Sequence, residues 1–237
     1  MRRGWLVVLV VLTACGSRAE PVPRPSDTTS PVFGVCGNAP VTVPANKIVF
    51  FSDLTDRCRV FVAPQADPVE RHEANGYRVT FLHGPTDWAN VLVWTQYASP
   101  PTGDERVEVD VEPTASGDTD LFGIACRSEG TRAKPGRWYT LLVALNGAYL
   151  IEFSNYGVPD PFDKTLASGI GPPLPRGRVH LRADCSGETL TLYANGNRIS
   201  SAPGEPSART GQAGLYIHEK TPGGASFVYM NMLVAKP

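Results

Sequence analysis

The strongest constraint on the fold is a β-hairpin signature at residues 185–201, CSGETLTLYANGNRISS. Leu190 and Leu192 alternate with threonine and tyrosine, which is the period-two pattern of a strand with one buried face. Asn195 and Gly196 follow directly and predict a tight turn, because both residue types tolerate positive φ. The hairpin therefore predicts that the chain folds as a β-sheet protein.

Short strand patterns recur along most of the chain, and Asn146-Gly147 marks the turn of a second hairpin. No run of helical periodicity exceeds about two turns, and the high content of turn formers, Gly 23 and Pro 22, fits many short connections. The stretch between residues 153 and 178, with DPFDK and GIGPPLPRG, is expected to be a long loop. The other expected strands are 48–51, 60–63, 77–82, 91–97, 106–112, 121–127, 138–145, 149–153, 178–184, 214–218 and 227–234. About a dozen antiparallel strands separated by turns predict an all-β jelly-roll sandwich.

The N-terminus has the features of a secretion signal. Arg2 and Arg3 precede an apolar run at 5–12 that is too short to span a bilayer. The run ends in LTACG, which resembles the bacterial lipobox and implies that Cys15 becomes the lipidated first residue. The alternative is an ordinary signal peptide with a chance cysteine. We expect a signal peptide at 1–14, a lipidated Cys15 with a Pro-rich tether at 15–35, and a β-sandwich domain at 36–237, held at the extracytoplasmic face of the cell membrane.

Cysteine usage agrees with an oxidising compartment. Lipidation of Cys15 leaves four of the five cysteines, an even number with three alternative pairings. We favour Cys36 with Cys58 and Cys126 with Cys185, because the last two each end a strand-like run, FGIAC and VHLRADC. Without a C-x-x-C pair or a His/Cys cluster, disulfides explain these cysteines better than zinc does.

The order of motifs in the domain resembles the concanavalin A-like lectin/glucanase superfamily. The motifs are G-I-x-C-R, W-Y-x-L-x-V, R-x-D-C-x-G-x-x-L-x-L-Y-x-N-G, G-x-x-G-L and a closing aromatic strand, over residues 48–234. The chain is most similar to secreted and lipoprotein versions from high-GC Gram-positive bacteria, related to laminin-G-like and 3-keto-disaccharide hydrolase-like domains. The resemblance implies a concanavalin A-like jelly roll, a fold that carries lectins, hydrolases and protein-binding modules alike.

Glu108, Asp110 and Glu112 are the clearest candidates for chemistry. Strand alternation places all three on one face of strand 106–112 and three valines on the other. Clustered carboxylates raise one another's pKa, as a glycosidase requires of its acid. E-V-D-V-E also resembles the catalytic strand of laminarinase-like glycoside hydrolases, which implies Glu108 as nucleophile, Asp110 as its electrostatic partner and Glu112 as general acid/base. The alternative is the solvated outer face of a half-exposed strand.

Exposed aromatic rings are candidates for a sugar-binding platform. Trp88 lies in the turn-rich segment GPTDWAN and Tyr156 in the loop SNYGVPDPFDK, so we expect these two to contact a glycan. For Trp94 and Trp138, packing in the core is the better interpretation.

Little points to a bound cofactor. Asp118 and Asp120, and likewise Asp160 and Asp163, are candidate calcium ligands at turns, with ordinary polar turns as the alternative. We expect no other metal and no cofactor. The sequence has no P-loop or G-x-G-x-x-G motif for a nucleotide, and its net charge of -1 gives no attraction for nucleic acid.

Three classes of function remain open at this point. The first is non-catalytic recognition of a glycan or envelope polymer at the cell surface, which we favour. The second is a glycoside hydrolase that uses the strand of Glu108, Asp110 and Glu112. The third is a structural or protein-binding lipoprotein.

Overall fold

The computed structural model describes residues 35–37, 43–55, 58, 69–82, 89–94, 102–131, 134–220 and 224–237, with only the backbone at 89–94, 130–131 and 134–135. All of these residues belong to the unit Pro31–Pro237. The predicted signal peptide, Cys15, tether residues 16–34, strand 60–63 and Trp88 lie outside the described residues. In the described part of the chain, no helix has the length and apolarity that crossing a membrane would need.

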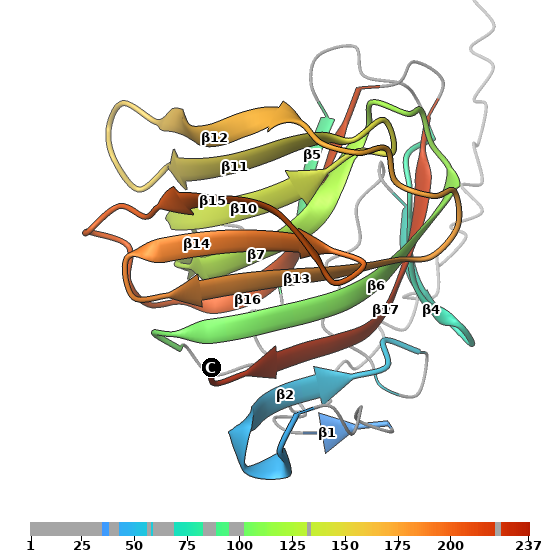
Figure 1. Ribbon diagram of the computed structural model, residues 1–237, viewed down its shortest axis with the longest axis horizontal. Helices are drawn as coiled ribbons and strands as arrows, with labels where there is room; N and C mark the ends of the chain where they lie inside the picture. Colours follow the sequence, from blue (N-terminus) through green and yellow to red (C-terminus); the bar gives the residue numbers. More distant parts are fainter. Residues whose placement is uncertain are drawn as a thin grey trace, which may run out of the picture. The chain divides into compact units, whose positions relative to one another are not determined.

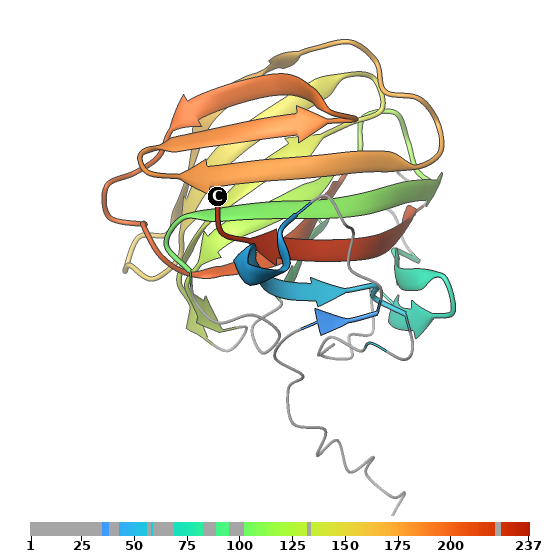
Figure 2. The same ribbon diagram turned by 60° about the horizontal axis from the view of Figure 1, so that its bottom comes forward.

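Two sheets, antiparallel except for the parallel pairing of β1 with β2, form a sandwich (Figure 1), which confirms the predicted all-β jelly roll. The larger sheet runs in the order β1-β2-β17-β6-β13-β14-β15, with β4 on β17 and β3 on β4. Its strands are β1 (Val35–Cys36), β2 (Ile48–Ser52), β3 (Val69–Glu73), β4 (Gly76–Thr80), β6 (Glu105–Ala115), β13 (Val179–Ser186), β14 (Thr189–Ala194), β15 (Asn197–Pro203) and β17 (Ser226–Ala235). Figure 2 shows β6 and β17 side by side in this sheet.

The smaller sheet runs in the order β12-β11-β10-β7-β16-β5. Its strands are β5 (Ala89–Trp94), β7 (Leu121–Ser128), β10 (Arg137–Val143), β11 (Ala148–Asn155), β12 (Phe162–Ile170) and β16 (Gln212–Glu219). Two short strands, β8 (Gly130–Thr131) and β9 (Lys134–Pro135), pair only with each other, and a 3₁₀ turn, η1 (Ala45–Lys47), precedes β2.

The core lies between the two sheets, as strand alternation requires. Val107, Val109 and Val111 of β6 are fully buried and share one apolar cluster with Ile124 and Leu141 of the smaller sheet. Each buried aliphatic side chain of this kind contributes roughly 1.5–3 kcal/mol through removal of apolar surface from water. The outward-facing positions of the same strands are therefore the ones left for function.

The hairpin at residues 185–201 forms as predicted, with β14 and β15 joined by a tight turn. Asn195 and Gly196 have φ values of 49° and 80°, the left-handed pair that a two-residue hairpin turn requires. The Asn195 side chain also accepts a hydrogen bond of 2.9 Å from the His180 backbone, so the turn is attached to β13.

The prediction of one long loop between residues 153 and 178 was wrong, because β12 (Phe162–Ile170) lies within it and pairs with β11. β12 is an edge strand whose side chains are mostly exposed, so it lacks the apolar alternation that identifies a half-buried strand. Leu166 and Ala167 pack against the core, and Phe162 lies edge-on to Phe153 with ring centroids 6.1 Å apart. β12 depends on the hydrogen-bond ladder with β11, which a sequence pattern does not reveal.

Both favoured disulfides are present. Cys36 and Cys58 are joined with a Cα–Cα distance of 5.6 Å. Cys126 of β7 and Cys185 of β13 are joined with a Cα–Cα distance of 6.7 Å, so the second disulfide connects the two sheets.

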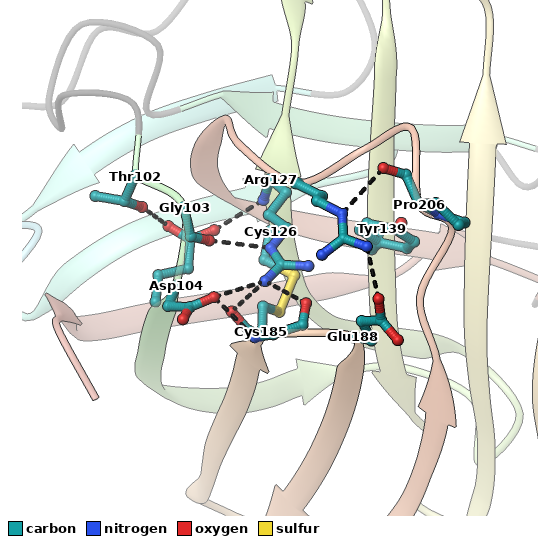
Figure 3. Close-up of polar contacts among 12 residues, drawn as sticks. Thr102, Gly103, Asp104, Cys126, Arg127, Tyr139, Cys185, Glu188 and Pro206 are labelled. Carbon is teal, nitrogen blue, oxygen red and sulfur yellow. Dashed lines mark hydrogen bonds and ion pairs between the residues drawn. A yellow bond between two sulfur atoms is a disulfide. The ribbon is translucent and has the colours of Figure 1, made fainter.

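Arg127 follows Cys126 in the chain and is only 2% exposed. Figure 3 shows its side chain beside the inter-sheet disulfide and its polar partners. Its guanidinium donates hydrogen bonds of 3.0–3.1 Å to the carbonyl oxygens of Gly103, Cys185 and Gly187 and to the carboxylate of Asp104. Its backbone N–H donates to Glu105, whose pKa burial raises to about 7 against the opposing effect of its hydrogen bonds. Because these donors are used within the fold, Arg127 links the ends of β6, β7 and β13 and is a structural residue.

Candidate functional site

The carboxylates of β6 lie on one face, as the sequence predicted. Val107, Val109 and Val111 point into the core, whereas Glu108 and Asp110 lie on the outer face of the larger sheet. Glu112 is half-buried two residues farther along and is opposite Val228 of β17. The carboxylates of β6 therefore share the outer face as predicted. Their protonation states depend on the side chains of the neighbouring strands β13 and β17.

His180 joins Glu108 and Asp110 into a polar cluster. It lies on β13 directly opposite Asp110, with its Nδ1 2.9 Å from Asp110 Oδ1 and its Nε2 3.5 Å from Glu108 Oε2. The hydrogen bonds to Asp110 and Glu108 raise the pKa of His180 to about 9, so the imidazole is protonated at neutral pH. Sequence reasoning missed this residue, although the polar alternation in 178–184 marks His180 as outward-facing.

A bulge in β17 adds a further contact to Asp110. The register between β17 and β6 shifts between Met230 and Leu233, and Asn231 adopts a φ of 55° there. This geometry lets the Asn231 amide donate a 2.9 Å hydrogen bond to Asp110 Oδ2. Bulges commonly re-aim side chains in this way.

Both carboxylates of this cluster are held in the ionised form. Burial alone would raise the pKa of Glu108, but the hydrogen bond with His180 and the charge of Arg106 bring it below its ordinary value. Burial likewise opposes ionisation of Asp110, and the hydrogen bonds from His180 and Asn231 outweigh it, so its pKa is also lowered. Neither group can act as a proton donor near neutral pH, and each already has a cationic partner.

A second polar cluster lies on the outer face of the smaller sheet, and it includes Tyr156. The Tyr156 ring is 40% exposed and stacks on Trp138 of β10, with ring centroids 5.2 Å apart and an angle of 19° between the planes. Its hydroxyl donates a 3.0 Å hydrogen bond to Asp163 of β12. Trp138 is buried, as predicted, but beneath Tyr156 and outside the main core cluster.

Glu152 of β11 lies on the same face, beside Asp163. Burial, with the charge of Asp163 acting in the same direction, raises the pKa of Glu152 to about 7. Burial raises the pKa of Tyr216 on β16, and the negative charges of Glu152 and Asp163 raise it further. These residues form one set, which we call the Tyr156 cluster: Trp138, Thr140, Glu152, Tyr156, Asp163 and Tyr216.

The predicted calcium residues have other partners. Asp118 forms an ion pair of 2.7 Å with Arg176. Asp120 is buried and accepts hydrogen bonds from the backbone N–H groups of Gly117 and Lys220. Asp160 is exposed, and Asp163 belongs to the Tyr156 cluster. Within the described ranges, no group of three or more His, Cys, Asp or Glu side chains is arranged to hold a metal ion.

Comparison with known proteins identifies the fold but no family. No protein-family model matches the sequence, and no curated protein matches it. Carbohydrate-binding module CBM66 from Bacillus subtilis superposes with a TM-score of 0.54 at 16% identity, over 72% of this chain and 92% of that one.

Two enzymes share the same architecture. A β-glucanase from Bacillus licheniformis matches with a TM-score of 0.51 at 10% identity, over 79% of this chain and 98% of its own. A GH16 protein of Bacteroides ovatus, from a mixed-linkage glucan PUL and in complex with a G4G4G3G product, matches with a TM-score of 0.52 at 5% identity, over 79% and 100% of the two chains. At these identities the likeness shows the jelly-roll fold.

Proposed function

We propose that this protein is a lipid-anchored recognition domain at the extracytoplasmic face of the cell membrane that binds a glycan or envelope polymer through the Tyr156 cluster. The observation that carries the proposal is the exposed Tyr156 ring, held flat against Trp138 and hydrogen-bonded to Asp163. The stack and the hydrogen bond restrict the ring before any ligand arrives, so binding loses little side-chain entropy.

The chemistry of the cluster suits a saccharide. A sugar ring presents C–H groups on its faces and hydroxyl groups on its rim, and these require an aromatic surface beside polar acceptors. Tyr156 supplies the surface, and Asp163 and Glu152 supply the acceptors. The fold that this chain shares with a carbohydrate-binding module and two glucan-related proteins agrees with such a ligand.

Recognition is favoured over hydrolysis by the state of the acidic strand. A retaining glycosidase requires one ionised carboxylate and one protonated acid about 5–5.5 Å apart. In the hydrolase alternative Glu108 is the nucleophile, yet Arg106 and His180 already contact its carboxylate, and His180 and Asn231 already contact Asp110. These contacts suit a structural role on the outer face better than attack on a substrate. The hydrolase would gain support if purified protein released reducing ends from a glucan and Glu112→Gln abolished that release.

Replacement of Tyr156 by alanine tests the recognition site. We expect Tyr156→Ala to weaken binding of the best glycan from an array by about tenfold or more, which corresponds to about 1.4 kcal/mol. Calorimetric titration of the full-length protein in detergent measures the change, and an unaltered unfolding midpoint shows that the fold is retained.

Tyr193→Ala is the matched control. Tyr193 lies on β14 of the other sheet, where the Arg182 guanidinium is 4.5 Å from its ring centroid. Its loss should leave glycan affinity unchanged. Equal weakening in both variants, or an array without any bound glycan, would overturn the proposed function and leave a structural or protein-binding lipoprotein.

The lipid anchor is tested separately. Cys15→Ala removes the acceptor of the lipid, and we expect the protein to move from the membrane fraction into the medium or the soluble extracytoplasmic fraction. Hydrophobic anchoring by acyl chains contributes about 0.8 kcal/mol per buried CH₂, so its loss should be nearly complete. Immunoblots of the two fractions report the result, and membrane retention equal to the native chain would contradict the anchor.

A further inference from the structure

Glu152 lacks a cationic partner in the described part of the chain, in contrast to Glu108 and Asp110 on the other sheet. Among the described residues none donates a hydrogen bond to Glu152 or forms an ion pair with it, and the charged group acting on it is another acid, Asp163. Glu108 provides the contrast, since Arg106 and His180 both contact it. A half-buried carboxylate beside a second carboxylate is electrostatically unfavourable until a cation approaches.

Thr140 provides an independent sign that the cluster is incomplete. It lies directly opposite Glu152 in the β10–β11 ladder, on the same outer face, and is fully buried. Its hydroxyl oxygen has no hydrogen-bond partner among the described residues. Buried polar atoms in proteins are nearly always paired, so an orphan hydroxyl beside an unpaired carboxyl indicates a place that a ligand completes.

A register shift brings these groups to the strand edge. The pairing of β11 with β12 shifts between Ile151 and Glu152, so that Glu152 pairs with Thr165 and Ser154 pairs with Asp163. Glu152 and Asp163 are thus diagonal neighbours across the ladder, a spacing over which side chains still interact. Both carboxyl groups lie on the face that Tyr156 covers.

We propose that the Tyr156 cluster recognises a saccharide that carries a free amino group, with the ammonium placed between Glu152 and Asp163 and the sugar ring against Tyr156. This inference rests on the proposed function, because it names the class of glycan that the same cluster binds. An ammonium supplies the missing cation, donates up to three hydrogen bonds, and is attracted to the face of an aromatic ring. An N-acetylated or anionic sugar brings no positive charge to these two carboxylates.

The surrounding ionisable groups agree with a cationic ligand. Burial and, in second place, the charge of Asp163 on β12 raise the pKa of Glu152. Burial and Asp163 also raise the pKa of the Tyr156 hydroxyl, and burial raises the pKa of Tyr216 on β16, so both hydroxyl groups are neutral near neutral pH. Farther along, His218 has a lowered pKa through burial and the charge of Lys220. An ammonium beside Glu152 favours its ionised form, so binding near pH 7 should release a proton from this group.

Two oligosaccharides that differ in the acetylation of their amino groups test the inference. We expect a β-1,4-linked glucosamine tetramer to bind the full-length protein in detergent at least tenfold more tightly than the N-acetylglucosamine tetramer, in calorimetric titrations at pH 7 and low salt. Glu152→Gln should reduce this preference to less than twofold, because glutamine carries no negative charge for the ammonium group. Glu112→Gln, the same change on the other sheet, should leave the preference intact.

The outcomes separate this inference from the proposed function. Equal affinity for the two tetramers, with both lost in Tyr156→Ala, would overturn amine recognition and leave glycan binding standing. A preference that Glu152→Gln does not alter would place the amine elsewhere and also overturn the inference. If neither tetramer binds, amine recognition fails, and the glycan array then decides the proposed function.

Discussion

Arg127→Met is expected to lower the free energy of unfolding by about 3–5 kcal/mol, the range found when one partner of a buried ionic network is removed. Methionine fills much of the space of the arginine side chain but donates no hydrogen bond. The carbonyl oxygens of Gly103, Cys185 and Gly187 and the carboxylate of Asp104 would each lose a donor. Urea unfolding of the full-length protein in detergent, with both disulfides oxidised, measures the loss.

Arg182→Met is the matched control for this prediction. Arg182 lies on the outer face of β13, where it forms an ion pair with Asp184 and both side chains remain partly exposed. Ion pairs of this kind contribute about 0–1 kcal/mol. A loss in Arg127→Met no larger than in Arg182→Met would contradict the structural role of the buried guanidinium.

Removal of the inter-sheet disulfide is expected to have an effect of similar size. The double variant C126A/C185A opens a crosslink between residues 59 apart in sequence. The chain-entropy relation for a loop of that length predicts a loss of about 4 kcal/mol. The effect arises mainly in the unfolded chain, which gains freedom when β7 and β13 are no longer connected.

The other disulfide provides the comparison. C36A/C58A opens a loop with a sequence separation of 22, for which the same relation predicts about 3 kcal/mol. We therefore expect both double variants to unfold at lower urea concentrations than the native protein, with C126A/C185A the lower of the two. The reverse order, or no change in either, would show that loop closure does not govern the stability supplied by these crosslinks.

The two outer faces show how the same residue types acquire different roles. On the larger sheet, His180 and Arg106 neutralise Glu108, and the result is a closed set of ion pairs. On the smaller sheet, Glu152 has an acid as its charged neighbour and an aromatic ring nearby, which leaves its charge available for a ligand. Electrostatic surroundings therefore separate a carboxylate that is neutralised within the fold from one that has no cationic partner among the described residues, even though both lie on half-exposed strands.

Most of the fold could be predicted from the sequence, because its signals are local. The β14–β15 hairpin follows from Leu190, Leu192 and the Asn195-Gly196 turn, and the buried face of β6 follows from three alternating valines. The even cysteine count left three pairings open, and the one favoured from the strand ends is present. β12 could not be predicted, since an exposed edge strand has no apolar periodicity and forms through its ladder with β11.

The candidate site was only partly visible in the sequence. Tyr156 could be selected as an exposed aromatic in a loop, but its stacking on Trp138 and its hydrogen bond to Asp163 depend on strands that are brought together by the sheet. Neither Glu152 nor Thr140 was a candidate, because an isolated acid or hydroxyl in a strand carries no signal. Their significance arises from a pairing register and from burial, and both are properties of the folded chain.

The sequence by itself determined that this protein is a disulfide-containing β-sandwich, because strand alternation, turn residues and cysteine parity act over a few residues at a time. The tertiary structure alone decided which carboxylates are neutralised and which are left without a cation. His180 reaches Asp110 and Glu152 reaches Asp163 through antiparallel pairing between separate strands. The electrostatic state of a group depends on neighbours in space, and only the assembled sheets specify those neighbours.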